Sequence, residues 1–110
     1  MKLPDYQSAI VPTEKLELYL LSEIHPVGRA KALFLTNLGY DISEPGILAQ
    51  ELLTLAREGD VSDVQTSQFG SKYVVDGLIR TPSGATVSLR TVWIIEPDHP
   101  QPRLVTAYPR

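Results

Sequence analysis

Apolar residues recur every three to four positions in the first half of the chain, which is the spacing of amphipathic helices. This pattern predicts helices over 13–23, 26–38 and 44–58. The first is separated from the second by Pro26, which cannot lie inside a helix but suits the first turn of a new one. The third is expected to end at Gly59, a residue type that favours helix C-termini.

After Gly59 the apolar period changes from about 3.6 to 2, which is typical of strands. Segments 72–81 and 86–96 are rich in Val, Ile, Tyr and Trp. The link Thr-Pro-Ser-Gly-Ala between them predicts a short hairpin with Gly84 at positive φ. A further strand is expected over 103–108, and a weaker one over 61–66. We therefore expect an α+β fold in which about three N-terminal helices pack on one face of a three- to four-stranded antiparallel sheet.

The length of 110 residues favours a single domain with one core. We divide it into an N-terminal extension (1–11), a helical half (12–59) and a sheet half (60–110). The chain has no cysteine, which excludes disulfides, cysteine zinc sites and cysteine nucleophiles. No signal-peptide pattern and no apolar run of about 18 residues is present, so we expect a cytoplasmic protein without a membrane partner.

The net charge of −3 argues against nonspecific capture of nucleic acid, which depends on clustered Lys and Arg. The charge is unevenly distributed, however. The first 60 residues hold nine acids and five bases, whereas the last 50 hold four acids and five bases. The slightly basic second half favours an anion on the sheet, and a solvated helical surface is the alternative explanation of the acidic first half.

Side-chain alternation gives the predicted hairpin two unequal faces. Pairing Thr81 with Ala85 places Asp76 opposite Arg90. The more apolar face is the expected core face, and it carries Tyr73, Val75, Ile79, Val87, Leu89, Thr91, Trp93 and Ile95. Arg90 is then on the open face, where it either binds a substrate or forms a cross-strand salt bridge with Asp76.

Thr106 and Tyr108 share one parity in the last predicted strand, opposite to that of Arg103, Val105 and Ala107. If Val105 and Ala107 face the helices, Thr106 and Tyr108 lie on the open face with Arg90. A guanidinium, a hydroxyl and a phenol on one surface can bind a phosphate and transfer a proton. The alternative for Tyr108 is a half-buried aromatic residue near the C-terminus.

His25 is one of two histidines, and it lies where the second helix is expected to begin. Free amide groups at such an end favour an anion, and Lys31 follows six positions later. The two residues are candidates for a base and a phosphate clamp; alternatively, His25 caps a helix and Lys31 covers apolar surface. His99 is expected at the surface. No metal-ligand spacing and no nucleotide-cofactor glycine motif is present, so we predict no metal and no cofactor.

Four runs resemble those of a family of small bacterial and phage-associated domains of unknown function. They are HPVGRAKALF at 25–34, FGSKYVV at 69–75, RTVW at 90–93 and PRLVTAYP at 102–109. The organisation also resembles the barnase, EndoU, colicin and RelE group of metal-independent ribonuclease toxins. In that group, helices precede a four-stranded antiparallel sheet whose open face cleaves RNA.

This resemblance implies a catalytic set made of His25, Lys31, Arg90, Thr106 and Tyr108. His25 or Lys31 would accept the proton of an RNA 2′-hydroxyl that attacks its adjacent phosphate. Arg90 and Lys72 would stabilise the developing charge, and Tyr108 or His25 would protonate the leaving oxygen.

The same resemblance makes Arg29, Lys72 and Arg80 candidates for substrate binding. It implies RNA as the substrate and a small cognate protein of the antitoxin type as the partner, with no DNA partner expected. The acidic overall charge departs from the basic charge usual for ribonuclease toxins. An alternative function is therefore a noncatalytic protein-interaction domain of the immunity, antitoxin-like or regulatory type.

Overall fold

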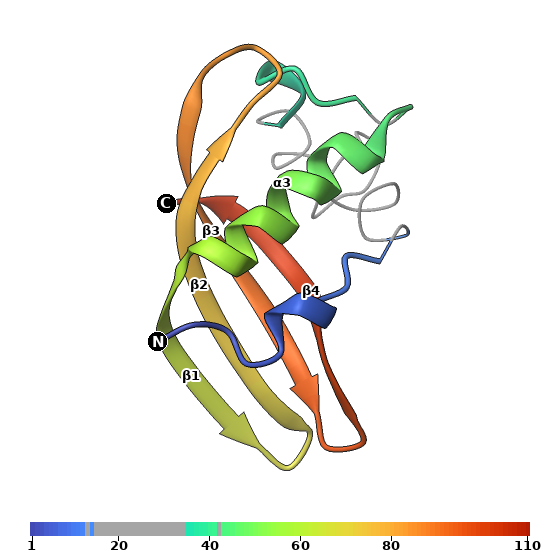
Figure 1. Cartoon of the computed structure of the whole chain (residues 1–110), viewed down its shortest axis with the longest axis vertical. Helices are drawn as coiled ribbons and strands as arrows, with labels where there is room; N and C mark the ends of the chain where they lie inside the picture. Colours follow the sequence, from blue (N-terminus) through green and yellow to red (C-terminus); the bar gives the residue numbers. More distant parts are fainter. Residues whose placement is uncertain (13, 15–34, 42) are drawn as a thin grey trace.

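The computed structural model describes residues 1–12, 14, 35–41 and 43–110. In chain order its elements are a short 3-10 helix η1 (Tyr6–Ser8), an α-helix α3 (Pro45–Glu58) and four strands. The strands form one antiparallel sheet in the order β1-β2-β3-β4, so each strand pairs with its neighbour in the sequence (Figure 1). Their bounds are β1 (Asp60–Ser67), β2 (Gly70–Arg80), β3 (Thr86–Glu96) and β4 (His99–Pro109).

Helix α3 agrees closely with the prediction of a helix over 44–58. Pro45 is its first residue, where the missing N–H costs nothing, and Leu48, Leu52 and Leu55 are all buried. Gly59 follows the helix but has a φ of −74°, so it is not a left-handed cap. Glycine is needed there because a Cβ would lie 2.7 Å from two carbonyl oxygens, one of them that of Asp76. This close approach lets the chain turn directly from α3 into β1.

The hairpin of β2 and β3 has the predicted register. Asp76 pairs with Arg90, and Arg80 pairs with Thr86 at the turn. Gly84 has a φ of 93°, as expected for this turn. The correct register follows from the turn, since a slip of one residue would carry every side chain to the other face.

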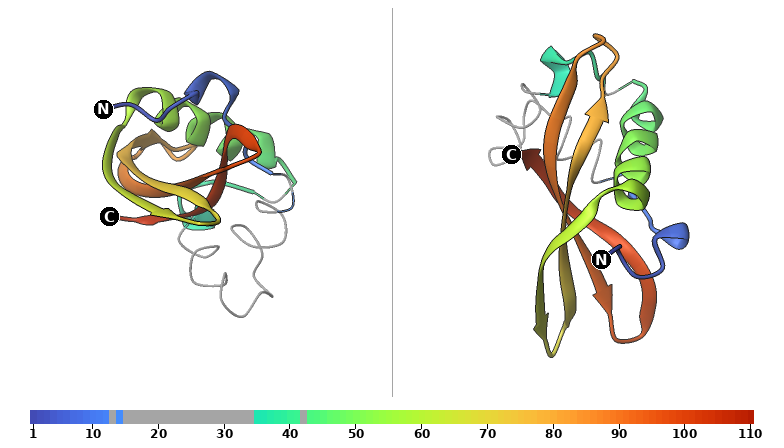
Figure 2. Two further views of the ribbon diagram at one scale, coloured as in Figure 1. Left: turned by 90° about the horizontal axis from the view of Figure 1, so that it is seen from below. Right: turned by 60° about the vertical axis from the view of Figure 1, so that its left-hand side comes forward.

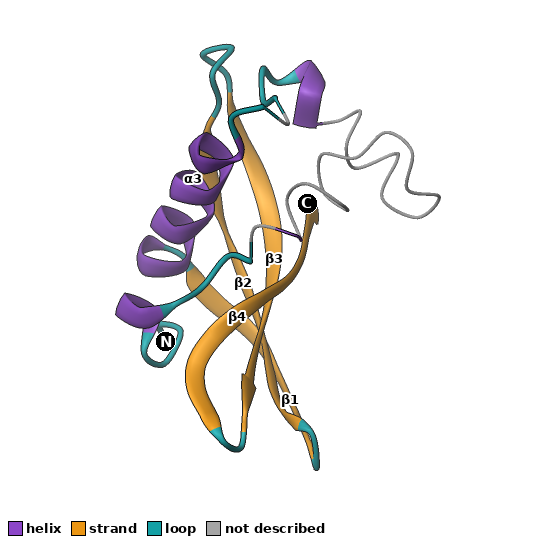
Figure 3. Cartoon of the chain, turned by 90° about the vertical axis from the view of Figure 1, so that its right-hand side faces the viewer, coloured by secondary structure: helices purple, strands orange, loops and turns teal. Residues whose placement is uncertain are grey.

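The helices η1 and α3 lie on one side of a strongly twisted sheet (Figures 2 and 3). The core lies between α3 and the sheet face beneath it, and Trp93 is its largest fully buried side chain. Most of the predicted core face is buried there, namely Val75, Ile79, Leu89, Thr91 and Trp93. Leu104 and Ala107 of β4 belong to the same core. It also includes the buried side chains of Leu3, Leu35 and Tyr40.

Strand β4 is longer than predicted, because 99–102 belongs to it despite its two prolines. Proline is tolerated in an edge strand. Pro102 accepts a hydrogen bond from the Ile10 N–H (2.8 Å) through its carbonyl, which faces away from β3. Leu104 donates its N–H to the Ile10 carbonyl (3.0 Å), so Ile10 covers part of this outer edge.

Strand β1 is the opposite edge of the sheet, and seven of its eight residues are exposed. Its pairing with β2 shifts register between Val61 and Asp63, which marks a β-bulge. Just after the bulge, Asp63 Oδ1 accepts the N–H of Val64 (2.9 Å). The weak strand predicted over 61–66 is therefore a complete edge strand.

The expectation of about three helices on the sheet is wrong. In the described residues the sheet dominates, and α3 is the only helix of more than one turn. The two other predicted helices, over 13–23 and 26–38, lie largely outside those residues. The sheet was underestimated because the acidic, polar β1 and the proline-containing start of β4 lack the apolar alternation of a half-buried strand.

Candidate functional site

The sheet face opposite α3 carries charged and polar side chains in rows that run across the strands. One row contains Asp60, Asp76, Arg90 and Tyr108, and the next contains Asp63, Val74, Val92 and Thr106. A third row contains Gln65, Lys72, Ile94 and Arg103. Directly paired residues of an antiparallel sheet share a face. The structure thus brings the predicted site residues Lys72, Arg90, Thr106 and Tyr108 onto one surface, which we call the charged face.

Arg90 and Asp76 form a two-pronged ion pair in the middle of the charged face. Arg90 Nε lies 2.8 Å from Asp76 Oδ1, and Nη2 lies 3.0 Å from Oδ2. The Asp76 side chain is only 8% exposed, whereas that of Arg90 is 35% exposed. The salt bridge with Asp76, which the sequence left open as an alternative for Arg90, is therefore present. Because the pair is partly buried and bidentate, it fixes the orientation of the guanidinium.

Asp76 and Arg90 hold each other in their charged forms. The hydrogen bonds from Arg90 lower the pKa of Asp76, and a hydrogen bond from Ser62 and the charge of Arg110 act in the same direction. Burial opposes them. The same hydrogen bonds and the negative charge of Asp76 raise the pKa of Arg90 further, with a smaller contribution from Tyr108. Arg90 is consequently a fixed cation that can bind an anion but cannot transfer a proton.

Tyr108 and Arg110 complete this row. The Tyr108 side chain forms a hydrogen bond with Arg90, which follows from their pairing across β3 and β4. Arg110 Nε lies 3.7 Å from Asp76 Oδ2, and its side chain is 56% exposed. Asp76 and the two guanidiniums together carry a net charge of +1, and Asp60, the partner of Asp76 on β1, lies 3.7 Å from Lys2 Nζ. This is a surface suited to one anionic group beside a phenol.

Lys72 is a further cation of the charged face, toward the β1–β2 turn, and it lines one hollow together with Glu14. Arg103 Nη2 lies 2.6 Å from Glu96 Oε1, so its charge is balanced. Lys72 has no ion pair within the described part of the chain. It lies between two hollows of about 460 and 490 Å³, both of which it lines together with Ile94.

Not all predicted site residues are brought together. His25, Arg29 and Lys31 lie outside the described residues. Arg80 has the strand parity of the charged face, but it pairs with Thr86 at the far end of β2. Its backbone is hydrogen-bonded to α3, because the Arg80 N–H donates to Glu51 Oε1 (2.8 Å).

Sequence reasoning missed two cations of this face, Arg103 and Arg110. The register of β3 and β4 shifts between Val92 and Trp93, where Thr106 and Leu104 are their partners. Val105 is the extra residue of this bulge, so Leu104 enters the core and Arg103 joins Ile94 on the charged face. Simple alternation had given Arg103 the opposite face. Arg110 carried no signal, because its contact with Asp76 depends on the path of the chain after β4.

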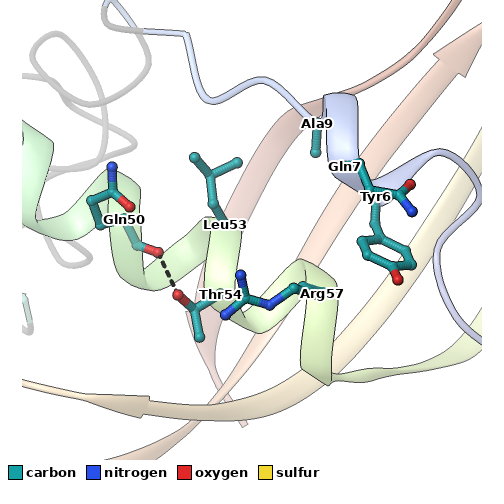
Figure 4. Close-up of a pocket in the computed structure, with 7 residues that line it drawn as sticks. All are labelled: Tyr6, Gln7, Ala9, Gln50, Leu53, Thr54 and Arg57. Carbon is teal, nitrogen blue, oxygen red and sulfur yellow. Dashed lines mark hydrogen bonds between the residues drawn. The ribbon is translucent and has the colours of Figure 1, made fainter.

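A separate hollow of about 350 Å³ lies between η1 and α3, away from the charged face (Figure 4). Tyr6 and Gln7 line one side of it, and Leu53, Thr54 and Arg57 line the other. Thr54 Oγ1 donates to its own helix, at the Gln50 carbonyl (2.9 Å).

No cluster of three or more His, Asp or Glu residues that could hold a metal ion occurs among the described residues. No helix in the same part of the chain is long and apolar enough to cross a membrane.

Comparison with known proteins identifies the family. Residues 2–110 match the domain of unknown function DUF6883, so the chain belongs to that family. No curated protein matches the chain. Among solved structures, a chain of a contact-dependent growth inhibition toxin–immunity protein complex from Klebsiella pneumoniae 342 is similar, with a TM-score of 0.72 and 21% identity. The match covers 93% of this chain and 100% of that chain, and it shows that the two share a fold.

Proposed function

We propose that this DUF6883 domain is the toxin of a toxin–immunity pair, that it cleaves RNA without a metal ion, and that a small cognate protein neutralises it. The observation that carries the proposal is the row of Asp76, Arg90 and Tyr108 on the charged face. The assignment to a toxin–immunity pair is supported by the similarity in fold, over nearly the whole chain, to a chain of a toxin–immunity complex. Fold alone does not fix function, so the chemistry is argued from the row itself.

In the proposed reaction an RNA 2′-oxygen forms a bond to the adjacent phosphorus, and the bond from phosphorus to the 5′-oxygen breaks. The products are a 2′,3′-cyclic phosphate and a 5′-hydroxyl. Negative charge develops on the nonbridging oxygens, and Arg90 is the cation that stabilises it. Asp76 is a positioning residue, because its carboxylate orients the guanidinium of Arg90.

Proton transfer is assigned to groups other than Arg90, whose raised pKa keeps it charged. Tyr108 is the proposed acid for the leaving 5′-oxygen, and Thr106 in the next row binds a phosphate or sugar oxygen. His25 or Lys31 remains the proposed base. Arg29 and Arg80 remain proposed contacts to the RNA backbone.

Lys72 has a role distinct from that of Arg90. The two lie in rows four residues apart along β2, which is about 13 Å at about 3.3 Å per residue. That separation is too large for both cations to contact one phosphate directly. We therefore assign Lys72 to a neighbouring phosphate.

The test is cleavage of total RNA by the purified protein, with end-group analysis of the products, alongside growth after induction. We expect cyclic phosphate ends and arrested growth. Tyr108→Phe removes a single oxygen and should slow cleavage without unfolding the protein. Arg90→Gln should abolish it, with circular dichroism used to verify folding. Arg57→Ala removes an equal charge from α3 and should cleave like the wild type. If the wild-type chain leaves growth and RNA intact and cleaves no RNA in any buffer, the enzyme proposal fails.

A second candidate function is a noncatalytic immunity or regulatory domain. It is favoured by the commitment of Arg90 to Asp76 and by the net charge of −3, which weakens attraction to RNA. In this case the chain would protect cells from a partner toxin when the two are produced together. Protection by the wild type, combined with the absence of RNA cleavage, would favour this function over the first.

A further inference from the structure

The hollow beside the β1–β2 turn has the features of a binding site for a flat, partly apolar ligand. It has a volume of about 460 Å³, within the range of small-ligand sites. Phe69, which lines it, is the most exposed large apolar side chain of the described residues, at 71%. Ile94 forms the apolar floor on β3, and Gln65 and Lys72 supply polar groups from a cross-strand pair.

The turn itself does not require an aromatic residue at position 69. Ser67 closes the turn, because its Oγ accepts the Phe69 N–H (3.1 Å) and donates to the Gly70 carbonyl (3.4 Å). Gly70 has a φ of 126°, and a Cβ there would collide with the Ile95 carbonyl. Ser67 and Gly70 thus supply the turn chemistry. Phe69 is 71% exposed, so its ring is open to a ligand that stacks on it.

The charges around the hollow favour an anionic ligand. Lys72 is exposed and has no ion pair within the described chain, so its ammonium can meet a phosphate. Gln65 Nε2 donates to Asp63 Oδ2 (3.4 Å), which leaves its carbonyl oxygen and one N–H for the edge of a nucleobase. No carboxylate lines this hollow. The acids beside it already have partners, because Asp63 accepts a hydrogen bond from Gln65 and Glu96 is paired with Arg103.

The hollow also lies at a useful distance from the proposed catalytic row. Lys72 is about 13 Å along β2 from the position of Asp76 and Arg90, at about 3.3 Å per residue. The half-buried row of Val74, Val92 and Thr106 separates them on the same face. An extended strand lying on the charged face can therefore reach the hollow while its scissile phosphate contacts Arg90.

We propose that this hollow binds one nucleotide of single-stranded RNA near the scissile phosphate, with its base stacked on Phe69 and its phosphate held by Lys72. This inference rests on the proposed function, because it supplies a subsite for the same substrate. Single-stranded RNA is the class that fits, since its unstacked bases are free to stack on aromatic side chains. Stacking accepts any base, so the site adds affinity with little sequence preference.

The test uses a fluorescein-labelled 2′-O-methyl oligonucleotide of eight residues, which cannot be cleaved because it lacks the attacking hydroxyl. Binding to the full chain is followed by fluorescence anisotropy. Base stacking measured by alanine substitution is worth about 1–3 kcal/mol, so Phe69→Ala should weaken binding about 5- to 150-fold. Phe69→Tyr keeps the ring and should bind like the wild type. Ile47→Ala shortens an exposed apolar side chain on α3 and is the matched control.

Two further measurements test the details of the subsite. Lys72→Ala should reduce the slope of log K against log salt by about 0.7, the value for one phosphate of a single strand. An oligonucleotide with an abasic residue should bind the wild type more weakly when that residue occupies the hollow, and the defect should vanish in Phe69→Ala.

Several results would overturn this subsite. The first is that the wild-type protein does not bind the oligonucleotide. The second is that Phe69→Ala binds it as tightly as the wild type does. The third is that Phe69→Ala no longer binds a cognate protein partner while its RNA binding is unchanged. The last would make Phe69 a protein contact. Failure of the enzyme proposal can be distinguished from failure of the subsite proposal. If binding depends on Phe69 but ordinary RNA is not cleaved, the subsite proposal stands and the enzyme proposal fails. Cleavage unaffected in Phe69→Ala removes the subsite and retains the enzyme.

Discussion

Thr91 and Trp93 form a buried hydrogen-bonded pair whose contribution to stability can be measured directly. Both residues are fully buried on the core face of β3. Thr91 Oγ1 donates to the Val75 carbonyl (2.8 Å) and accepts the indole N–H of Trp93 (2.8 Å). One fully buried hydroxyl therefore accepts the indole N–H and donates its own proton to a carbonyl. We predict that Thr91→Val destabilises the protein although valine has nearly the same shape.

The magnitude follows from the groups left without partners. A buried indole N–H without an acceptor costs about 1–3 kcal/mol, and the lost bond to the Val75 carbonyl costs about 0.5–1.5 kcal/mol. The methyl group that replaces the hydroxyl returns up to about 0.8 kcal/mol through apolar burial. We expect a net loss of about 2 kcal/mol. With a urea m-value of about 2 kcal/mol/M, the unfolding midpoint should fall by about 1 M.

Urea unfolding followed by far-UV circular dichroism measures this loss. Trp93 is the single tryptophan of the chain, so its fluorescence gives an independent signal from the core. Thr91→Ser is the control, because it keeps both hydrogen bonds and loses one methyl group, at a cost of about 1 kcal/mol. Valine should therefore be the more damaging of the two substitutions.

A double-mutant cycle with Trp93→Phe isolates the hydrogen bond between the two side chains. Phenylalanine has no N–H, so Thr91→Val should cost about 1–3 kcal/mol less in that background. The reasoning is refuted if Thr91→Val is as stable as the wild type, or if it is more stable than Thr91→Ser.

Three further predictions concern other parts of the molecule. Asp76 has a lowered pKa in the folded state, so the stability it contributes is present above its unfolded pKa and lost as the pH falls through its folded pKa. Asp76→Asn should therefore flatten the acid limb of urea midpoints measured between pH 6 and pH 2, and an unchanged acid limb would contradict the ion-pair geometry. Burial, together with the charge of Glu51, raises the pKa of Tyr40 to about 12. The stability that Tyr40 contributes is complete below the tyrosine pKa of the unfolded chain, near 10, and is lost as the pH rises toward 12. The stability of Tyr40→Phe should therefore depend less on pH between 9 and 11.5 than that of the wild type. Ultraviolet absorbance measures the ionisation of the phenol. Gly59→Ala should lower stability by about 1–3 kcal/mol because its Cβ meets the Asp76 and Leu55 carbonyls, whereas Gly46→Ala, with nothing within 4 Å, should be neutral or stabilising in thermal unfolding.

The β2–β3 hairpin was the most predictable part of the fold. Its register depends only on the turn at 81–85 and on the alternation of side chains, both of which are local. Helix α3 was predictable for a similar reason, since Pro45 and the spacing of Leu48, Leu52 and Leu55 mark its start and its buried face. The core face of the sheet followed from these two elements.

The rest depended on contacts that are distant in the sequence. The bulge at Val105 reversed the expected face of Arg103, and nothing near it in the sequence marks a bulge. The polar strand β1 pairs fully with β2 although it buries almost nothing. Asp76 was recognised only as an alternative partner for Arg90, because two of its other partners, Ser62 and Arg110, lie outside the hairpin.

The bulge in β1 bears on how the protein behaves at high concentration. An exposed edge strand offers unpaired N–H and C=O groups to any other extended chain, which is the route to fibrils. In β1 the Asp63 carboxylate takes the N–H of Val64, and the register shift breaks the regular repeat that an added strand would need. The opposite edge is partly covered by Ile10. We therefore expect Asp63→Val, which restores an apolar strand at this edge, to promote fibril formation that thioflavin fluorescence would detect.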